Sequence, residues 1–119
     1  FKRGEVLFAY IGKNVGYEQN NPRPVVVIEN NNTVKDRCVT IIPLSSIKEG
    51  KVHPKYEIDL GGVKGIGNED RVRTKALPKQ IKTIDKIRID YNKKVMARLS
   101  NEQLDAIDEK LKELFIKNK

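Results

Sequence analysis

Short apolar segments that are rich in β-branched residues recur through residues 1–99 and alternate with polar turns. Val, Ile, Thr and aromatic side chains favour strands, and the Gly, Asn and Pro clusters between the segments favour turns. Segment 24–29 is apolar almost throughout, which predicts a central strand buried on both faces, whereas 55–60 alternates apolar and charged residues like an edge strand. The predicted strands are 6–11, 24–29, 37–44 (ending at Pro43 and the Ser45–Ser46 pair), 55–60, 70–77, 80–84 and 92–99.

A single amphipathic helix is predicted from Ser100 onward. Ser100 is a good N-cap, and Gln103 three residues later completes a capping box. The apolar residues that follow share one helix face, which has to be buried on a sheet or on another subunit: Leu104, Ile107, Leu111, Leu114 and Phe115. Residues 1–119 are therefore expected to form one mainly β domain with helices, of the α+β class: a small twisted barrel closed by a C-terminal helix.

Two connecting segments complete the predicted chain path. The glycine-rich segment 61–68 is interpreted as a hairpin connection, because it lacks the GK[ST] signature of a phosphate-binding loop. Segment 85–89 is expected to form a short turn of helix.

The chain is basic, with 24 Lys and Arg against 16 Asp and Glu and a net charge of +8. The excess is concentrated at 71–94, which holds nine basic and two acidic residues. Such a surface is typical of a protein that binds a phosphate backbone, although lysine-rich surfaces also serve solubility alone. The charge favours a nucleic acid as the partner.

Cys38 is the only cysteine, which excludes an intramolecular disulfide and a CxxC-type zinc site. It is expected to be a small packed residue in a reducing compartment. The sequence has no stretch long and apolar enough for a membrane span, and residues 1–4 lead directly into strand-like sequence rather than into a leader peptide. The expected location is the cytoplasm, with no membrane contact.

The most informative segment is 12–28, where a polar loop leads into the apolar strand. The loop carries Glu18 and Gln19, and Arg23 follows between two prolines that restrict the backbone on either side. Arginine keeps its charge and offers a fork of N–H donors that matches a phosphate. Arg23 is therefore expected to bind a phosphate group.

Several blocks of the sequence match the motifs of one known family. They are Arg3-Gly4-Glu5-Val6, the loop and strand at 12–28, Pro43-Leu44-Ser45-Ser46 at the place of a Pro-aliphatic-Thr turn, and Gln80-Ile81-Lys82-Thr83-Ile84-Asp85-Lys86 followed by Arg88. In the last block Lys82 stands where arginine is common. Because these blocks span nearly the whole chain in the right order, the sequence resembles the MazF/PemK toxin family of bacterial toxin–antitoxin systems.

The resemblance implies an SH3-like barrel with added helices that forms a homodimer. It also implies a metal-independent endoribonuclease, a sequence-selective mRNA interferase that cleaves single-stranded mRNA and thereby inhibits translation and growth. No metal or other cofactor is expected. The implied protein partner is a cognate antitoxin, whose acidic and partly disordered segment occupies the RNA groove.

The resemblance also assigns candidate catalytic residues. RNA carries its own nucleophile, the 2′-hydroxyl, whose attack gives a 2′,3′-cyclic phosphate and a 5′-hydroxyl end, so the protein has to hold the phosphate in line, stabilise its charge and move two protons. Arg23 is the expected phosphate clamp, and Ser45 supplies the hydroxyl of the usual threonine. Ser46 stays an alternative, because a one-residue shift exchanges the two serines. Glu18 is the candidate base or orients Arg23.

Further polar residues are candidates for RNA binding: Asn14, Tyr17, Gln19, Ser46, Lys48, Lys79, Gln80 and Lys82. Tyr17 is the best candidate to stack on an unpaired base, whereas Tyr10 and Tyr56 are interpreted as core residues of strands. His53, the sole histidine, is interpreted as an inert loop residue. Lys82, Lys86 and Arg88 either pair with Asp85 or line the groove.

Two other functions are compatible with the same barrel. One is a non-catalytic toxin that binds and poisons DNA gyrase, which would place function on the C-terminal helix and would not require Arg23. The other is an RNA-binding barrel that does not cleave its ligand.

Overall fold

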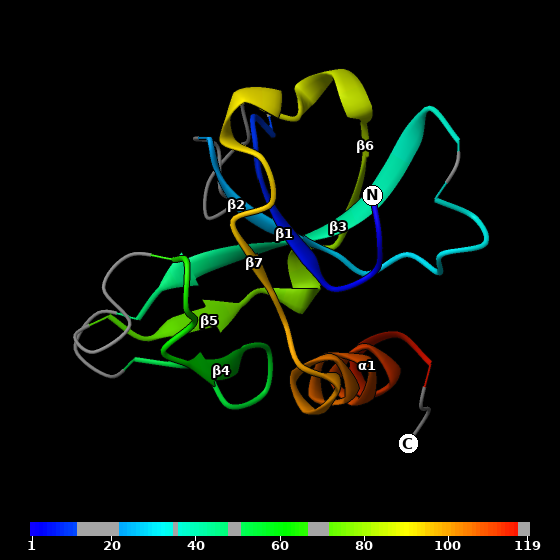
Figure 1. Cartoon of the computed structure of the whole chain (residues 1–119). Coiled ribbons are helices and arrows are strands. Elements are labelled where there is room, and N and C mark those ends of the chain that lie inside the picture. Colours follow the sequence, from blue (N-terminus) through cyan, green and yellow to red (C-terminus); the bar gives the residue numbers. More distant parts are fainter. Residues whose placement is uncertain (12–21, 35, 48–50, 67–71, 117–119) are drawn as a thin grey trace.

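The computed structural model describes residues 1–11, 22–34, 36–47, 51–66 and 72–116. In this part of the chain, seven strands form one curled antiparallel sheet in the order β4-β5-β3-β2-β1-β7, with β6 added on β3 (Figure 1). The strands are β1 (Glu5–Ala9), β2 (Arg23–Val27), β3 (Cys38–Ser46), β4 (Ile58–Gly61), β5 (Thr74–Ala76), β6 (Lys82–Asp85) and β7 (Ala97–Arg98). Three single-turn 3₁₀ segments, η1 (Pro78–Gln80), η2 (Lys86–Arg88) and η3 (Tyr91–Lys93), precede the helix α1 (Asn101–Phe115).

Strand β3 is the central strand of this sheet and pairs with β2, β5 and β6. Its first half, from Cys38 to Ile41, pairs with β6, and its last three residues pair with β5. Strand β2 pairs with the middle of β3, where Val25 lies opposite Pro43. The predicted end of the third strand at Leu44, closed by Pro43 and the two serines, is wrong, because the strand continues to Ser46. The missing N–H of Pro43 falls between the β6 and β5 ladders, and its carbonyl still accepts from the N–H of Leu77 at 3.0 Å. Ser45 and Ser46 therefore lie on a strand.

The core lies on both sides of the central strands. Val25 and Val27 belong to one buried cluster, with Leu7 and Ile41, whereas Val26 belongs to a second cluster that includes Ile107 of α1. Alternate residues of a strand point to opposite faces, so β2 is buried on both faces. This confirms the prediction for segment 24–29.

Helix α1 covers the second cluster, as its sequence predicts. The Ser100 Oγ accepts from the N–H of Gln103 at 3.1 Å, and the Gln103 Oε1 accepts from the N–H of Ser100 at 2.8 Å, which completes the capping box. Leu104 and Ile107 are buried, but Phe115 at the end of the predicted apolar face is 57% exposed. Only the first half of that face is thus buried within this chain.

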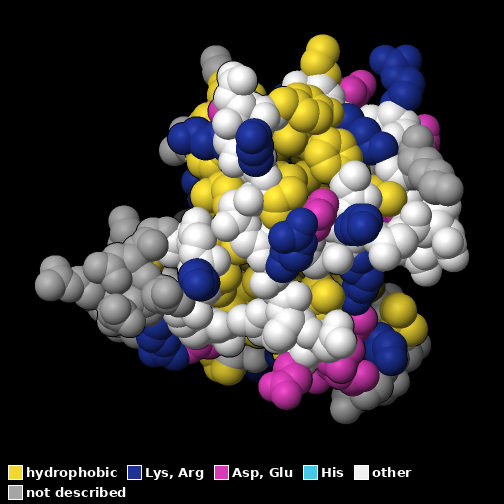
Figure 2. Space-filling view, viewed as in Figure 1, with side chains coloured by type: hydrophobic (Ala, Val, Ile, Leu, Met, Phe, Trp, Pro, Cys, Tyr) yellow, Lys and Arg dark blue, Asp and Glu magenta, His cyan; other side chains and the backbone are white. Residues whose placement is uncertain are grey.

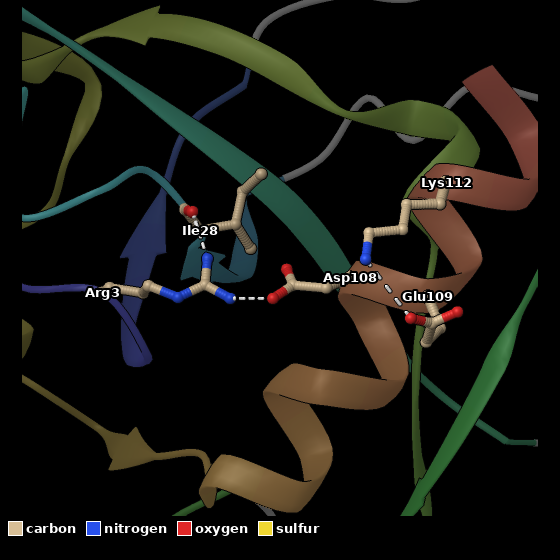
Figure 3. A network of polar contacts seen from close by, with 5 residues as sticks. All are labelled: Arg3, Ile28, Asp108, Glu109 and Lys112. Atoms are coloured by element: carbon tan, nitrogen blue, oxygen red, sulfur yellow. Dashed lines mark hydrogen bonds and ion pairs between the residues drawn. The ribbon is translucent and has the colours of Figure 1, made fainter. Parts of the chain in front are cut away.

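A polar network fixes the N-terminal segment to both β2 and α1 (Figure 3). One guanidinium nitrogen of Arg3 donates to the carbonyl of Ile28, just after β2, and the other lies 2.6 Å from the Asp108 Oδ2 on α1. The same face of the helix carries the Lys112–Glu109 pair at 3.4 Å. The Arg3 of the first family-like block therefore has a structural role.

Three strand predictions were longer than the strands observed. The edge strand expected at 55–60 begins only at Ile58, and Tyr56 lies in the preceding turn. Of the segment 92–99, only Ala97–Arg98 pairs with β1. Within the predicted strand 70–77, the observed strand is Thr74–Ala76. The helical turn expected at 85–89 is confirmed as η2.

The interpretation of Tyr10 and Tyr56 as core residues is wrong, because Tyr10 is 50% and Tyr56 37% exposed. Tyr10 follows the last residue of β1, and Tyr56 precedes β4, so neither ring is enclosed between the sheet faces.

Cys38 is half-buried at the start of β3. In the described ranges, the structure contains no helix that is long and apolar enough to span a membrane.

Candidate functional site

A cleft of about 870 Å³ opens over the ends of β2, β3 and β5. Four residues predicted from the sequence line it: Arg23 at the start of β2, Ser45 and Ser46 at the end of β3, and Gln80 at the end of η1. The structure thus brings together residues from segments that lie far apart in the chain.

Arg23, Ser45 and Lys75 are placed in a row across three neighbouring strands. Val25 pairs with Pro43; Arg23 lies two residues before Val25 and Ser45 two residues after Pro43, so both lie at the same end of this antiparallel ladder. On the other edge of β3, Ser45 pairs directly with Lys75 of β5. Residues that face each other across a ladder share a face of the sheet. A hydroxyl therefore lies between two cationic side chains along one wall of the cleft.

The Lys75 ammonium is held at this wall by Glu57. The Lys75 Nζ lies 2.8 Å from the Glu57 Oε1, and it also donates to the carbonyl of Lys51 at 3.3 Å. Burial alone would raise the pKa of Glu57, but hydrogen bonds from the backbone N–H of His53 and from Lys75, together with the charge of Lys75, hold this pKa below its usual range. Glu57 is thus ionised at neutral pH and balances part of the positive charge.

Arg23 is half-buried in the cleft wall. This burial lowers the pKa of the Arg23 guanidinium, yet arginine stays protonated in proteins. A partly desolvated guanidinium interacts more strongly with an anion than an exposed one does, because the local dielectric is lower. The arrangement of a guanidinium, a hydroxyl and an ammonium suits a phosphodiester.

Thr74 contributes a buried polar atom to the floor of the same cleft. It pairs with Ser46 across the β3–β5 ladder and is 1% exposed. Its Oγ1 has no hydrogen-bond partner among the described residues.

The remaining predicted residues divide into three groups. Lys79 lines a smaller hollow beside the cleft. Lys82 does not line the cleft; its Nζ donates to the carbonyl of Ile11 at 3.2 Å, so its role in RNA binding stays a prediction. The others lie outside the described residues, and their roles also stay predictions: Asn14, Tyr17, Glu18, Gln19 and Lys48.

His53 differs from the partnerless loop residue that its sequence context suggested. Its ring stacks on Tyr56 with centroids 4.3 Å apart, and its Nδ1 accepts from the N–H of Lys55 at 3.2 Å. Lys86 also has a defined contact, because its Nζ donates to the carbonyl of Val34. The Asp85 carboxylate lies 3.9 Å from the Arg37 guanidinium.

Sequence reasoning missed Lys75, Glu57 and Thr74 as cleft residues. Lys75 and Thr74 lie in the predicted strand 70–77, and Glu57 in the predicted strand 55–60, so their positions on strands or turns were foreseeable. The residues that surround them in the cleft could not be foreseen, because the pairing of β3 with β5 joins segments about thirty residues apart.

The family of the chain follows from comparison with known proteins. A sequence model of the family described as PemK-like, MazF-like toxins of type II toxin–antitoxin systems matches residues 2–115. The chain belongs to this family, as its sequence blocks predict.

Particular relatives support this assignment. The chain is 36% identical over 113 residues to Endoribonuclease EndoA of Bacillus subtilis, covering 92% of this chain and 90% of that protein. The fold is similar to the crystal structure of MazF from Deinococcus radiodurans, with a TM-score of 0.68, 20% identity, and coverage of 95% and 94% of the two chains. It is also similar to the toxin MazF-mt6 of Mycobacterium tuberculosis, with a TM-score of 0.69, 16% identity and coverage of 97% and 99%. The predicted mainly β architecture with one C-terminal helix is confirmed.

Proposed function

We propose that the protein is a sequence-selective endoribonuclease toxin that cleaves single-stranded mRNA. The main observation behind this proposal is that Arg23, Ser45 and Lys75 line one wall of the cleft. The 36% identical relative is named an endoribonuclease. The family membership adds the toxin role, since loss of mRNA stops translation and growth.

The proposed reaction uses the ribose as nucleophile. The 2′-oxygen attacks the adjacent phosphorus while the bond from phosphorus to the 5′-oxygen breaks, which leaves a 2′,3′-cyclic phosphate and a 5′-hydroxyl. Arg23 holds the scissile phosphate and stabilises the charge that grows on its non-bridging oxygens, and Ser45 donates a hydrogen bond to one of them. Glu18 is proposed to take the proton of the 2′-hydroxyl. Arg23 donates a hydrogen bond to the leaving 5′-oxygen, which takes up a proton from solvent water to become the 5′-hydroxyl.

This function is tested with a defined single-stranded RNA in the presence of EDTA. We expect cleavage to 2′,3′-cyclic phosphate ends, and no cleavage of the same oligonucleotide when a 2′-deoxyribose replaces the ribose at the cut site, because the nucleophile is then absent. End-group analysis by mass spectrometry distinguishes the products. RNA that stays intact, or a deoxy-substituted site that is still cut, would contradict the proposal.

The two serines are expected to differ in their effect on cleavage. Ser45 pairs with Lys75 at the same end of the sheet as Arg23, whereas Ser46 is the next residue of the strand and pairs with Thr74. Ser45→Ala is expected to slow cleavage by roughly 10²-fold, because one transition-state donor is lost. Ser45→Thr keeps the hydroxyl and should retain the cleavage rate. Ser46→Ala, the matched control, should change the cleavage rate by less than about 3-fold. Single-turnover rates measure this. A larger loss in Ser46→Ala than in Ser45→Ala would assign the hydroxyl to Ser46.

The proposed protein partners are a cognate antitoxin and a second copy of the chain. Solved relatives include an endoribonuclease in complex with its cognate antitoxin and a MazE–MazF complex. An acidic, partly disordered antitoxin segment would compete with RNA phosphates for Arg23 and Lys75, and it would pay its ordering cost on binding. A homodimer is supported by exposed apolar side chains on η2 and η3, where Ile87 is 83% and Tyr91 59% exposed. The segment that holds η2 and η3 lies at the top of Figure 1, and Figure 2, in the same view, shows hydrophobic side chains at the surface in its upper part.

We further propose that residues 1–119 form one toxin domain that acts in the cytoplasm. The family match over residues 2–115 supports the single domain. An mRNA substrate supports the location, because mRNA is translated there.

A further inference from the structure

A small hollow of about 180 Å³ adjoins the main cleft and has an aromatic wall. Its lining includes Tyr56 and Lys79, and it shares Glu57, Leu77 and Gln80 with the cleft. The shared residues show that the two spaces adjoin. A chain lying on the wall of Arg23 and Ser45 therefore places its next residue beside the hollow.

The Tyr56 ring is held in place from one side. The His53 ring stacks on it at 4.3 Å with an interplanar angle of 28°. The turn beneath the two rings is fixed, because the N–H groups of Tyr56 and Glu57 donate to the carbonyl of His53, at 3.2 Å and 2.9 Å, and the Glu57 Oε1 accepts from the N–H of His53 at 2.9 Å. His53 itself lines another hollow, together with Lys51 and Pro54. The platform is thus built before any ligand arrives.

Lys79, which also lines the hollow, lies over the Tyr56 ring. The Lys79 Nζ lies 4.4 Å from the ring centroid, and within the described part of the chain Lys79 forms no ion pair. A cation–π contact at an exposed site is weak, and a lysine side chain reorients easily. Lys79 can leave the ring when another planar group replaces it.

We propose that this hollow is a nucleobase subsite, in which one unpaired base of the bound RNA stacks on Tyr56 in place of Lys79. The displaced ammonium then pairs with a neighbouring phosphate, so one movement creates both a stacking and a charge contact. The Gln80 side chain at the rim offers an amide donor and acceptor to the edge of the base. The subsite rests on the proposed function and adds to it a second anchor point beside the scissile phosphate.

The absence of tryptophan from the chain gives a direct test. Tyr56→Trp introduces a single tryptophan, whose fluorescence should be quenched when an uncleavable 2′-O-methyl single-stranded RNA is added. Phe115→Trp is the matched control, because Phe115 is also exposed, at 57%, but lies at the end of α1 outside the cleft. We expect its emission to stay constant. A quenched Phe115→Trp with an unchanged Tyr56→Trp would overturn the assignment.

Affinity separates stacking from a merely structural role. Tyr56→Ala is expected to bind the 2′-O-methyl RNA about 5- to 100-fold more weakly, whereas Tyr56→Phe keeps the stacking face and should bind within about twofold of the wild type. The proposed subsite would be contradicted if Tyr56→Ala bound RNA as tightly as the wild type. It would also be contradicted if the fluorescence of Tyr56→Trp were not quenched at saturating RNA. If wild-type protein still cleaves unmodified RNA in EDTA, such a failure leaves the endoribonuclease function standing. If the RNA binds and quenches the fluorescence but is not cleaved, the enzymatic function would be contradicted and the base subsite would be supported.

Discussion

Arg23→Ala is expected to lower the rate of RNA cleavage by about 10²- to 10³-fold, the effect of removing one charged donor from a transition state. Arg23 is half-buried at the start of β2, so its guanidinium acts in a partly desolvated wall of the cleft that Ser45 also lines. Arg23→Lys keeps the charge but loses the fork of donors that binds two oxygens at once. We therefore expect only partial recovery in the lysine variant. Single-turnover cleavage at saturating enzyme measures both rates and excludes an effect on binding alone.

Arg37→Ala is the matched control for this prediction. It removes the same single charge, but the Arg37 side chain is 87% exposed and its ion pair with Asp85 is long, at 3.9 Å. Its cleavage rate should stay within about twofold of wild type at fixed ionic strength. Cleavage by Arg23→Ala at the rate of the Arg37→Ala control would place the phosphate clamp elsewhere.

The parts of the fold that depend on local chemistry could be predicted from the sequence. The capping box of Ser100 and Gln103 involves residues three positions apart, so the start of α1 was correct. The apolar run of β2 also predicted burial on both faces correctly. Arg23 was identified as a candidate because its two flanking prolines and its phosphate-binding chemistry are visible in one short segment.

Errors arose where long-range pairing overrides a local pattern. Tyr56, Ile58 and Leu60 alternate like one face of a strand, but the chain turns at His53–Glu57, and the β4–β5 ladder has a register shift between Asp59 and Gly61. Tyr56 is thereby removed from the strand and exposed beside the cleft.

Lys75 was missed for a related reason. A lysine within a short strand segment carries no local sign of function, and only its pairing with Ser45 places it at the cleft. The distinction between Ser45 and Ser46 likewise needs the β2–β3 register, which sequence spacing does not contain.

Gly65→Ala is expected to cause the largest loss of stability among the substitutions considered. Gly65 has φ of +100°, and a Cβ there would lie 2.0 Å from the carbonyl oxygen of Met96. That carbonyl belongs to the segment whose N–H groups hold β7 on β1: the N–H of Met96 donates to Val6 at 2.8 Å, and that of Leu99 to Gly4 at 2.9 Å. An alanine has to push this backbone away from the sheet. Left-handed strain and overpacking together cost roughly 2–5 kcal/mol.

Gly61→Ala separates the close contact from the strain. Gly61 also has a positive φ, +74°, but a Cβ there would meet nothing within 4 Å, so only the conformational cost of about 1–2 kcal/mol applies. Thermal unfolding followed by circular dichroism, at one protein concentration, compares the two variants with the wild type. We expect the Tm of Gly65→Ala to fall by about 10 °C or more, and that of Gly61→Ala by clearly less. Equal Tm values for the two variants would mean that the 61–66 connection does not pack against the backbone before β7, and that this contact does not hold the barrel closed.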